Sequence, residues 1–176
     1  MKEKEYHHPL PRDDAKTPDQ AIRKIRYADR EHLYVFKNGK QIRRFVGERD
    51  RVTLPDQYLF ELRDAIVVHN HPFGTSFSLE DIEMTIAHNI RKFIVVTEGF
   101  TYTVIRPHDG WPDTFDQEYI HNRFEICKSL AQEMSDKLIS QNEISLYEKD
   151  ATIIHYIWVL FFHNTNISYA KKELET

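Results

Sequence analysis

Two histidines separated by one residue, His69 and His71, end an apolar stretch that begins at Asp64. Side chains two residues apart on a β-strand point to the same side. Neutral imidazole is the commonest metal ligand in proteins, and two imidazoles from one strand form half of a zinc site. The pair therefore predicts a metal site at the end of a buried strand.

A third ligand is available shortly downstream, where Pro72 stops the strand and Gly74 permits a sharp turn. A helix is expected from Leu79, and its first turn carries Asp81. Three protein ligands and a water are typical of a catalytic zinc site rather than a closed structural one. Zinc lowers the pKa of such a water towards ~7, and the hydroxyl of Ser78 is placed where it could donate to an oxyanion.

This pattern resembles the JAB/MPN (JAMM) metallopeptidase family, which includes RadC-type proteins. The family motif is an upstream glutamate, then His-x-His, seven residues, Ser, two residues and Asp. Residues 69–72, His-Asn-His-Pro, look like the RadC-type first half, and residues 78–81, Ser-Leu-Glu-Asp, look like the second half. Only six residues separate His71 from Ser78, a shorter spacer that also looks like JAB-like domains associated with phages and bacterial toxins. The resemblance covers residues 27–106.

The resemblance implies a cytidine-deaminase-like sheet flanked by helices, with zinc held by His69, His71 and Asp81. It implies hydrolysis of a peptide or isopeptide bond in a protein or peptide substrate, with the family's glutamate as proton shuttle. In RadC-type sequences that glutamate opens the first strand of a hairpin, and the matching position is Glu31. Glu48 is the alternative, but we favour Glu31 because a strand start fixes a side chain better than a loop does.

Each of these residues also has a purely structural interpretation. Ser78 and Asp81 have the spacing of an ordinary helix start, in which the serine caps and the carboxylate favours the positive end of the dipole. The two histidines could be buried and hydrogen-bonded, and Asn70 is expected to tie the turn together. The corresponding alternative function is an inactive JAB-like scaffold that assembles through its C-terminal helices. Zinc-dependent phosphoester hydrolysis is a minor third option.

The elements that must position these residues alternate between helix and strand. Thr17 and Pro18 indicate a helix start, and Asn38-Gly39 is a strong two-residue hairpin turn. The order is a helix at 17–28, a hairpin at 32–36 and 41–46, a short helix at 55–63, a strand at 64–69, a helix from 79, and a second hairpin at 93–97 and 101–105. This order predicts an α/β (α+β) layered fold around a sheet.

The character of the chain changes after a breaker-rich linker at 107–112. Apolar residues from Ile120 to Leu138 recur at spacings of four and three, and a second helical stretch runs over about 144–162. Two such faces predict a helical hairpin that docks on the sheet or on a second subunit. We therefore expect a flexible segment at 1–16, a metallohydrolase domain at 17–106 and a helical extension at 107–176.

Composition narrows the partners and the compartment. A net charge of -4 implies no general polyanion-binding surface, so nucleic acid is not the expected partner. The lone Cys127 cannot form an internal disulfide. The most apolar run, 153–162, is about half of the roughly 20 residues that span a bilayer. We expect a soluble cytoplasmic protein.

Overall fold

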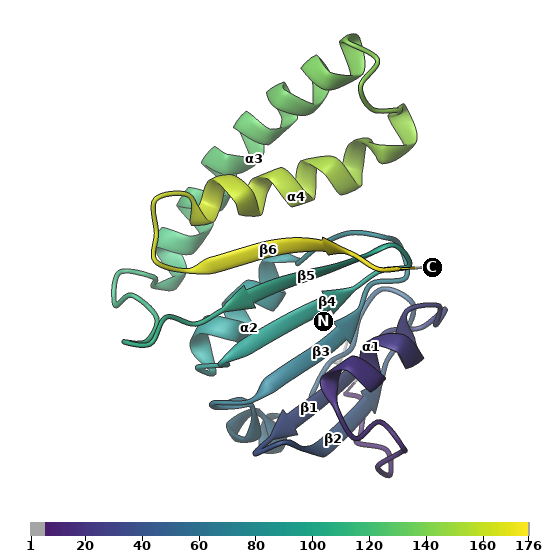
Figure 1. Cartoon of the computed structure of the whole chain (residues 1–176). Helices are drawn as coiled ribbons and strands as arrows, with labels where there is room; N and C mark the ends of the chain where they lie inside the picture. Colours follow the sequence, from purple (N-terminus) through teal and green to yellow (C-terminus); the bar gives the residue numbers. More distant parts are fainter. Residues whose placement is uncertain (1–5, 176) are drawn as a thin grey trace.

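Six strands form one mixed sheet in the order β2-β1-β3-β4-β5-β6 (Figure 1). The computed structural model describes residues 6–175. All neighbouring strands are antiparallel except β3 and β4, which are parallel. The strands are β1 (His32–Lys37), β2 (Lys40–Val46), β3 (Ile66–Asn70), β4 (Lys92–Val96), β5 (Phe100–Ile105) and β6 (Ser168–Glu173).

Both expected hairpins are present. Asn38 and Gly39 connect β1 to β2 with φ values of 51° and 73°, as a two-residue turn with positive φ at both positions requires. The parallel pair β3–β4 needs a crossover connection, and α2 (Leu79–Ala87) lies in that connection. The sequence-based prediction of a mixed α/β layered fold is confirmed at this level.

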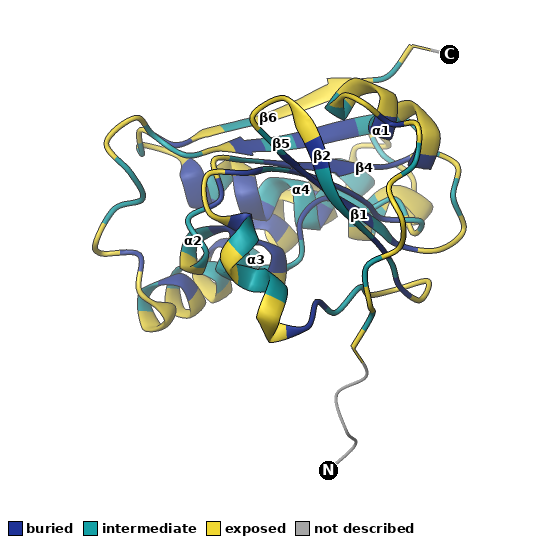
Figure 2. Ribbon diagram, turned by 90° about the horizontal axis from the view of Figure 1, so that it is seen from below, coloured by how far each residue is buried: buried dark blue, intermediate teal, exposed yellow. Residues whose placement is uncertain are grey.

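Alternation along β1 divides the core between the two faces of the sheet. Leu33 and Val35 belong to the larger hydrophobic cluster, whereas Tyr34 and Phe36 belong to the smaller one on the other face. The smaller cluster is covered by α1 (Pro18–Ile25), which Thr17 caps as expected. The larger cluster is covered by α2 together with α3 (Gln117–Ser140) and α4 (Lys149–Phe162) (Figures 1 and 2).

The C-terminal region forms the expected pair of helices, and it packs against the sheet of its own chain. Trp158 and Phe161 on α4 are fully buried in the larger cluster. Helix α4 begins later than the pattern indicated because a short 3-10 turn, η2 (Leu146–Glu148), precedes it. Strand β6 was not expected. Its sequence is polar, and it becomes a strand by pairing along β5.

Two other segments differ in detail from the sequence-based expectation. The short helix before β3 is a 3-10 helix, η1 (Asp56–Leu62). The N-terminal segment that we expected to be flexible contacts the sheet: the amide of Leu10 donates to the carbonyl of Arg44, and Ala15 is buried. The first five residues of that segment lie outside the described range. Across residues 6–175, every helix is too short or too polar to cross a bilayer.

Candidate metal centre

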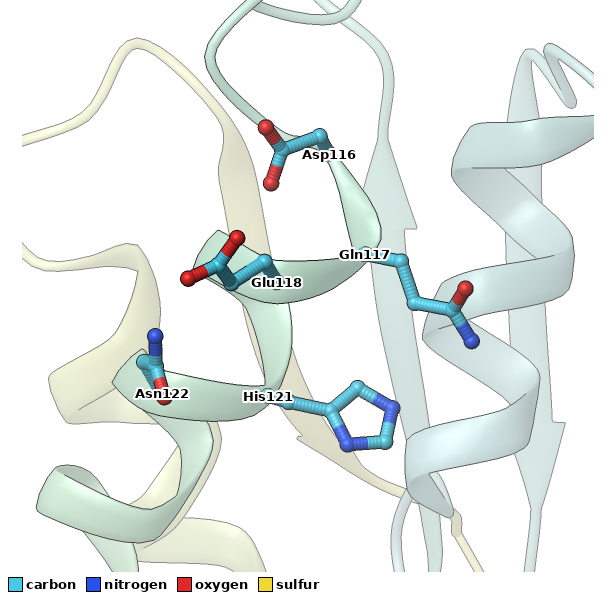
Figure 3. Close-up of a pocket in the computed structure, with 5 residues that line it drawn as sticks. All are labelled: Asp116, Gln117, Glu118, His121 and Asn122. Atoms are coloured by element: carbon cyan, nitrogen blue, oxygen red, sulfur yellow. The ribbon is translucent and has the colours of Figure 1, made fainter.

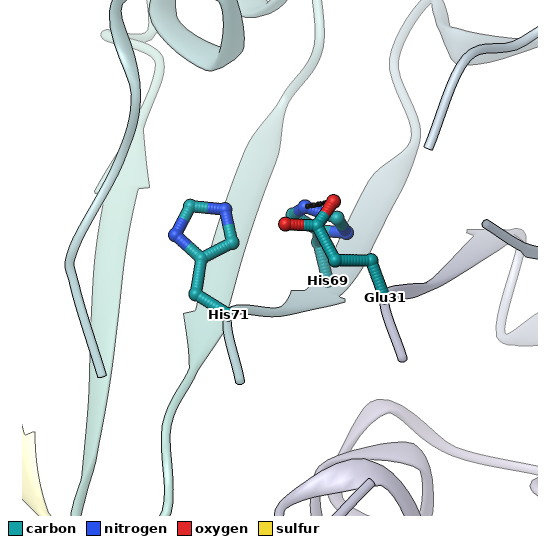
Figure 4. Close-up of side chains that lie close together, drawn as sticks. All are labelled: Glu31, His69 and His71. Carbon is teal, nitrogen blue, oxygen red and sulfur yellow. Dashed lines mark ion pairs between the residues drawn. The ribbon is translucent and has the colours of Figure 1, made fainter. Parts of the chain in front are cut away.

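Three buried side chains converge where β1 begins and β3 ends: Glu31 precedes β1, His69 lies in β3, and His71 follows β3 (Figure 4). Glu31, His69 and His71 each offer one ligand atom, and these atoms lie within 4.8 Å of one another. Leu33 pairs with His69 across the antiparallel strands, so continuing that register by two residues brings Glu31 opposite His71. The predicted pairing of the two imidazoles therefore exists, and the cluster could bind a metal ion.

Backbone carbonyl groups orient both imidazole rings. Nδ1 of His69 lies 2.9 Å from the carbonyl oxygen of His32, and Nδ1 of His71 lies 2.8 Å from that of Ser76. A carbonyl oxygen only accepts hydrogen bonds, so each Nδ1 carries the proton and donates it. The lone pair of each neutral ring is then on Nε2. This arrangement, with Nδ1–H bound to the backbone and Nε2 open, is the usual one for metal-binding histidines.

Each Nε2 atom faces a carboxylate. Nε2 of His69 lies 3.2 Å from Oε2 of Glu31, and Nε2 of His71 lies 3.3 Å from Oδ2 of Asp81. The two rings are nearly perpendicular, with an interplanar angle of 89° and centroids 4.8 Å apart. Two imidazole nitrogens and nearby carboxylate oxygens are ligands that suit zinc and other divalent transition metals. The donor set therefore fits the kind of ion that the sequence predicted.

Asp81 contacts His71 but does not belong to the group of three that converges on one point. Its Oδ2 accepts a hydrogen bond from the amide of Ser78, and Oγ of Ser78 accepts one from the amide of Asp81, which together form a capping box. Ser78 and Asp81 thus start α2 as the structural interpretation required. The same carboxylate nevertheless contacts His71, one of the three residues of the cluster.

Burial and pairing act in opposite directions on the pKa values of Asp81 and His71. Burial is the largest single effect and raises the pKa of Asp81, but His71, His69 and the amide of Ser78 together outweigh it and lower that pKa to about 2. Burial likewise lowers the pKa of His71, but Asp81, Glu31 and the carbonyl of Ser76 together outweigh it, so this pKa is raised. A carboxylate beside the imidazole compensates the burial of a cation.

The two candidate glutamates occupy different environments. Glu31 is 6% exposed and belongs to the cluster. The carboxylate of Glu48 instead lies 3.1 Å from the guanidinium of Arg30. Glu48 meets the site through its backbone, because its carbonyl oxygen accepts a hydrogen bond from the amide of Glu31 at 2.7 Å. Of the two, Glu31 is the one whose carboxylate reaches the histidines.

Sequence reasoning missed the groups that hold the site residues in place. Asn70, expected to tie its own turn, bonds instead to the chain around Glu31. His71 is held by carbonyl groups of residues 75 and 76. Backbone carbonyls carry no sequence signal, and the proximity of Asn70 to Glu31 depends on the pairing of β1 with β3. No local pattern could have indicated either contact.

A separate open depression lies at the first turns of α3 (Figure 3). It is lined by Asp116, Gln117, Glu118, His121 and Asn122. Nε2 of His121 lies 2.6 Å from Oε1 of Glu83 on α2. The His121 side chain is half exposed, and the pair lacks the second imidazole of the buried cluster, so it is a useful reference for the site rather than a rival to it.

Searches for similar proteins return no match among protein-family models, curated proteins or solved structures. The function is therefore inferred from the geometry of the buried cluster.

Proposed function

We propose that this protein is a zinc-dependent metallopeptidase or isopeptidase with the JAB/MPN type of site. The observation that carries the proposal is the buried pair His69 and His71, whose Nδ1 atoms are fixed by carbonyls and whose Nε2 atoms face carboxylates. Glu31, His69 and His71 each bring a ligand atom to within 4.8 Å of the others, close enough to share one ion. The motif resemblance in residues 69–81 supports the same conclusion.

In this proposal His69, His71 and Asp81 hold the ion, and Glu31 is the general base. When bound, zinc supplies a Lewis acid that polarises a carbonyl group and makes a water molecule acidic near neutral pH. The carboxylate of Glu31 takes a proton from the attacking water and passes it to the leaving amine. Oγ of Ser78 accepts a hydrogen bond from the amide of Asp81. The hydroxyl proton of Ser78 is therefore able to form a second hydrogen bond, to the developing oxyanion.

The substrate class follows from the resemblance of residues 69–81 to the JAB/MPN motif, which implies cleavage of a peptide or isopeptide bond. A carbonyl carbon is the electrophile, and the leaving group is an amine that needs a proton, as in a peptide or isopeptide bond. A base that receives and returns one proton serves both steps. The proposed substrate is therefore a protein or peptide.

Metal content and turnover test the proposal separately. The wild-type protein, purified after zinc supplementation, should carry one zinc per chain by atomic spectroscopy. His69→Ala and His71→Ala should lose it, whereas His121→Ala, which removes the exposed histidine paired with Glu83, should keep it. A wild-type chain without zinc, together with a double histidine variant of equal stability, would overturn the proposal.

The two carboxylates are separated by conservative variants. Asp81→Asn keeps an oxygen that can accept the amide of Ser78, so the start of α2 is preserved while a charged ligand is removed. It should weaken zinc binding by at least 10-fold. Glu31→Gln should retain zinc but lose cleavage of quenched fluorescent peptides and isopeptide-linked peptides. Glu48→Gln is the control and should behave as wild type.

An inactive scaffold is the second candidate. It is favoured by one observation, the exposed apolar side chains Ile126, Leu130 and Met134 that follow one another on α3. Sedimentation analysis separates the candidates: a scaffold of this kind would form a defined oligomer that survives the histidine substitutions and would take up no zinc.

A further inference from the structure

The loop that connects β3 to α2 holds two site residues at once. The carbonyl oxygens of Thr75 and Ser76 lie 3.2 and 2.8 Å from Nδ1 of His71. Two residues later, Ser78 forms the capping box that orients Asp81. Residues 75–78 therefore determine the distance between the imidazole of His71 and the carboxylate of Asp81.

A hydrogen bond from the C-terminal hairpin holds the middle of this loop. The indole N–H of Trp158 on α4 donates to the carbonyl oxygen of Phe77 at 2.7 Å, and both residues are fully buried. The ring of Phe77 also packs edge-on against Phe93 of β4, with centroids 5.5 Å apart. The side chain of Phe77 is thus held by the sheet, and its carbonyl is held by α4.

We propose that Trp158 is a positioning residue for the metal centre, and that α4 is thereby a working part of the site. The inference rests on the proposed function. The Phe77 carbonyl lies between the Ser76 carbonyl that holds His71 and the Ser78 side chain that caps α2. Without the hydrogen bond from Trp158, the peptide groups on either side of Phe77 can rotate. The Ser76 carbonyl that holds His71 and the Ser78 side chain that orients Asp81 are then no longer at a fixed distance from each other. Partners that orient metal ligands commonly change metal affinity by about 10- to 100-fold.

The chain contains a matched control, because it has two tryptophans. The indole nitrogen of Trp111 is buried but has no hydrogen-bond partner among the described residues. Trp158→Phe and Trp111→Phe thus remove the same group, and only the first breaks a bond to the site loop. Both variants keep an aromatic ring in the core.

The experiment measures zinc affinity by competition with a chelator, and the visible absorption spectrum of the cobalt-loaded protein, at a temperature where all variants are folded. We expect Trp158→Phe to bind zinc about 10-fold more weakly and to alter the cobalt bands. Trp111→Phe should match wild type. A tryptophan with only a packing role would lower the melting temperature without changing either readout.

A second route keeps the test decisive if Trp158→Phe does not fold. In the Trp111→Phe background, Trp158 is the sole tryptophan, and it can be replaced by benzothienylalanine, which has the indole shape but a sulfur instead of the N–H. The same weaker zinc binding is expected. If wild type binds zinc and this protein binds it equally well with the same cobalt spectrum, the role of Trp158 is refuted. If wild type binds no zinc, the proposed function itself fails.

Discussion

Asn70 binds the main chain on both sides of Glu31. Its Oδ1 accepts the amide of His32 at 2.6 Å, and its Nδ2 donates to the carbonyl of Arg30 at 3.0 Å. Asn70 is 1% exposed, so water does not replace these bonds. The residue between the two histidines thus fixes the glutamate that faces them, and residues 69–71, at the end of β3, hold both sides of the cluster.

Replacing this clamp should destabilise the protein. Asn70→Ala leaves the amide of His32 and the carbonyl of Arg30 without these bonds, and an unsatisfied buried group costs about 1–3 kcal/mol. We expect the free energy of unfolding in urea to fall by roughly 2 kcal/mol. Asn122→Ala, an exposed position on α3, should change it by less than about 0.5 kcal/mol. Equal stabilities of the two variants would contradict the clamp.

Gly47 leaves no room for a side chain beside Glu31. A Cβ atom there would overlap the carbonyl oxygen of Arg51 and lie 2.8 Å from Cα of Val52, while the amide of Gly47 donates to the carbonyl of Glu31 at 2.8 Å. Gly47→Ala should therefore displace this loop and destabilise the fold by about 1–3 kcal/mol. A Cβ atom at Gly99 would meet no atom within 4 Å, so Gly99→Ala should be nearly neutral. Thermal unfolding of both variants measures the difference. A neutral Gly47→Ala would show that the loop moves freely.

His155 should make stability depend on pH below neutrality. Burial lowers the pKa of His155 to about 4, with a smaller effect from the charge of Lys171. In the unfolded chain, the pKa of His155 is near its ordinary value of 6.5, so the unfolded chain takes up this proton at a higher pH than the folded chain does. Stability therefore falls as the pH drops from about 6.5 to about 4. His155→Gln removes this proton but can still accept from the hydroxyl of Tyr169, which lies 2.9 Å from Nδ1 of His155. Urea titrations at several pH values should show a flatter profile for the variant; parallel profiles would refute the assignment.

Asp13 should anchor the N-terminal segment. Its carboxylate accepts from the hydroxyl of Tyr34 and from the guanidinium of Arg44, each at 2.7 Å, and lies 2.9 Å from Nζ of Lys24. Asp13→Ala leaves a largely buried guanidinium without its partner, and we expect a loss of about 2 kcal/mol in unfolding free energy.

The neighbouring residue supplies the control for Asp13. Asp14 also pairs with Lys24, but its side chain is 87% exposed, and exposed pairs contribute about 0–1 kcal/mol. Asp14→Ala should therefore have a small effect. If limited proteolysis cut near residue 13 at the same rate in Asp13→Ala and in wild type, the anchoring role would be wrong.

Local pattern predicted the parts of the site that lie within one element. The two-residue spacing at the end of β3 predicted that His69 and His71 lie together. Glu31 came from the resemblance to the JAB/MPN motif instead, and it lies near them because β1 pairs with β3. The roles of Asp81 and Ser78 in catalysis stay predictions. The capping box that they form was the structural alternative read from the same residues.

The contacts that sequence could not predict join segments far apart in the chain. The bond from Trp158 to Phe77 spans 81 residues, and that of Leu10 with Arg44 depends on a segment without periodic pattern. Strand β6 was missed because Lys171, Lys172 and Glu173 have no apolar alternation. Such residues become a strand only when a neighbouring edge offers its amides and carbonyls.

Strand β6 has a consequence for the chain during synthesis. Until the residues of β6 emerge from the ribosome, β5 is the edge strand of the sheet. Tyr102 and Val104 then lie on a strand whose outer amide and carbonyl groups are unpaired. Open borders of this kind recruit strands from other molecules. Strand β6 covers this edge after the other strands have been made. A nascent or proteolysed chain that lacks β6 should therefore be the form that aggregates through β5.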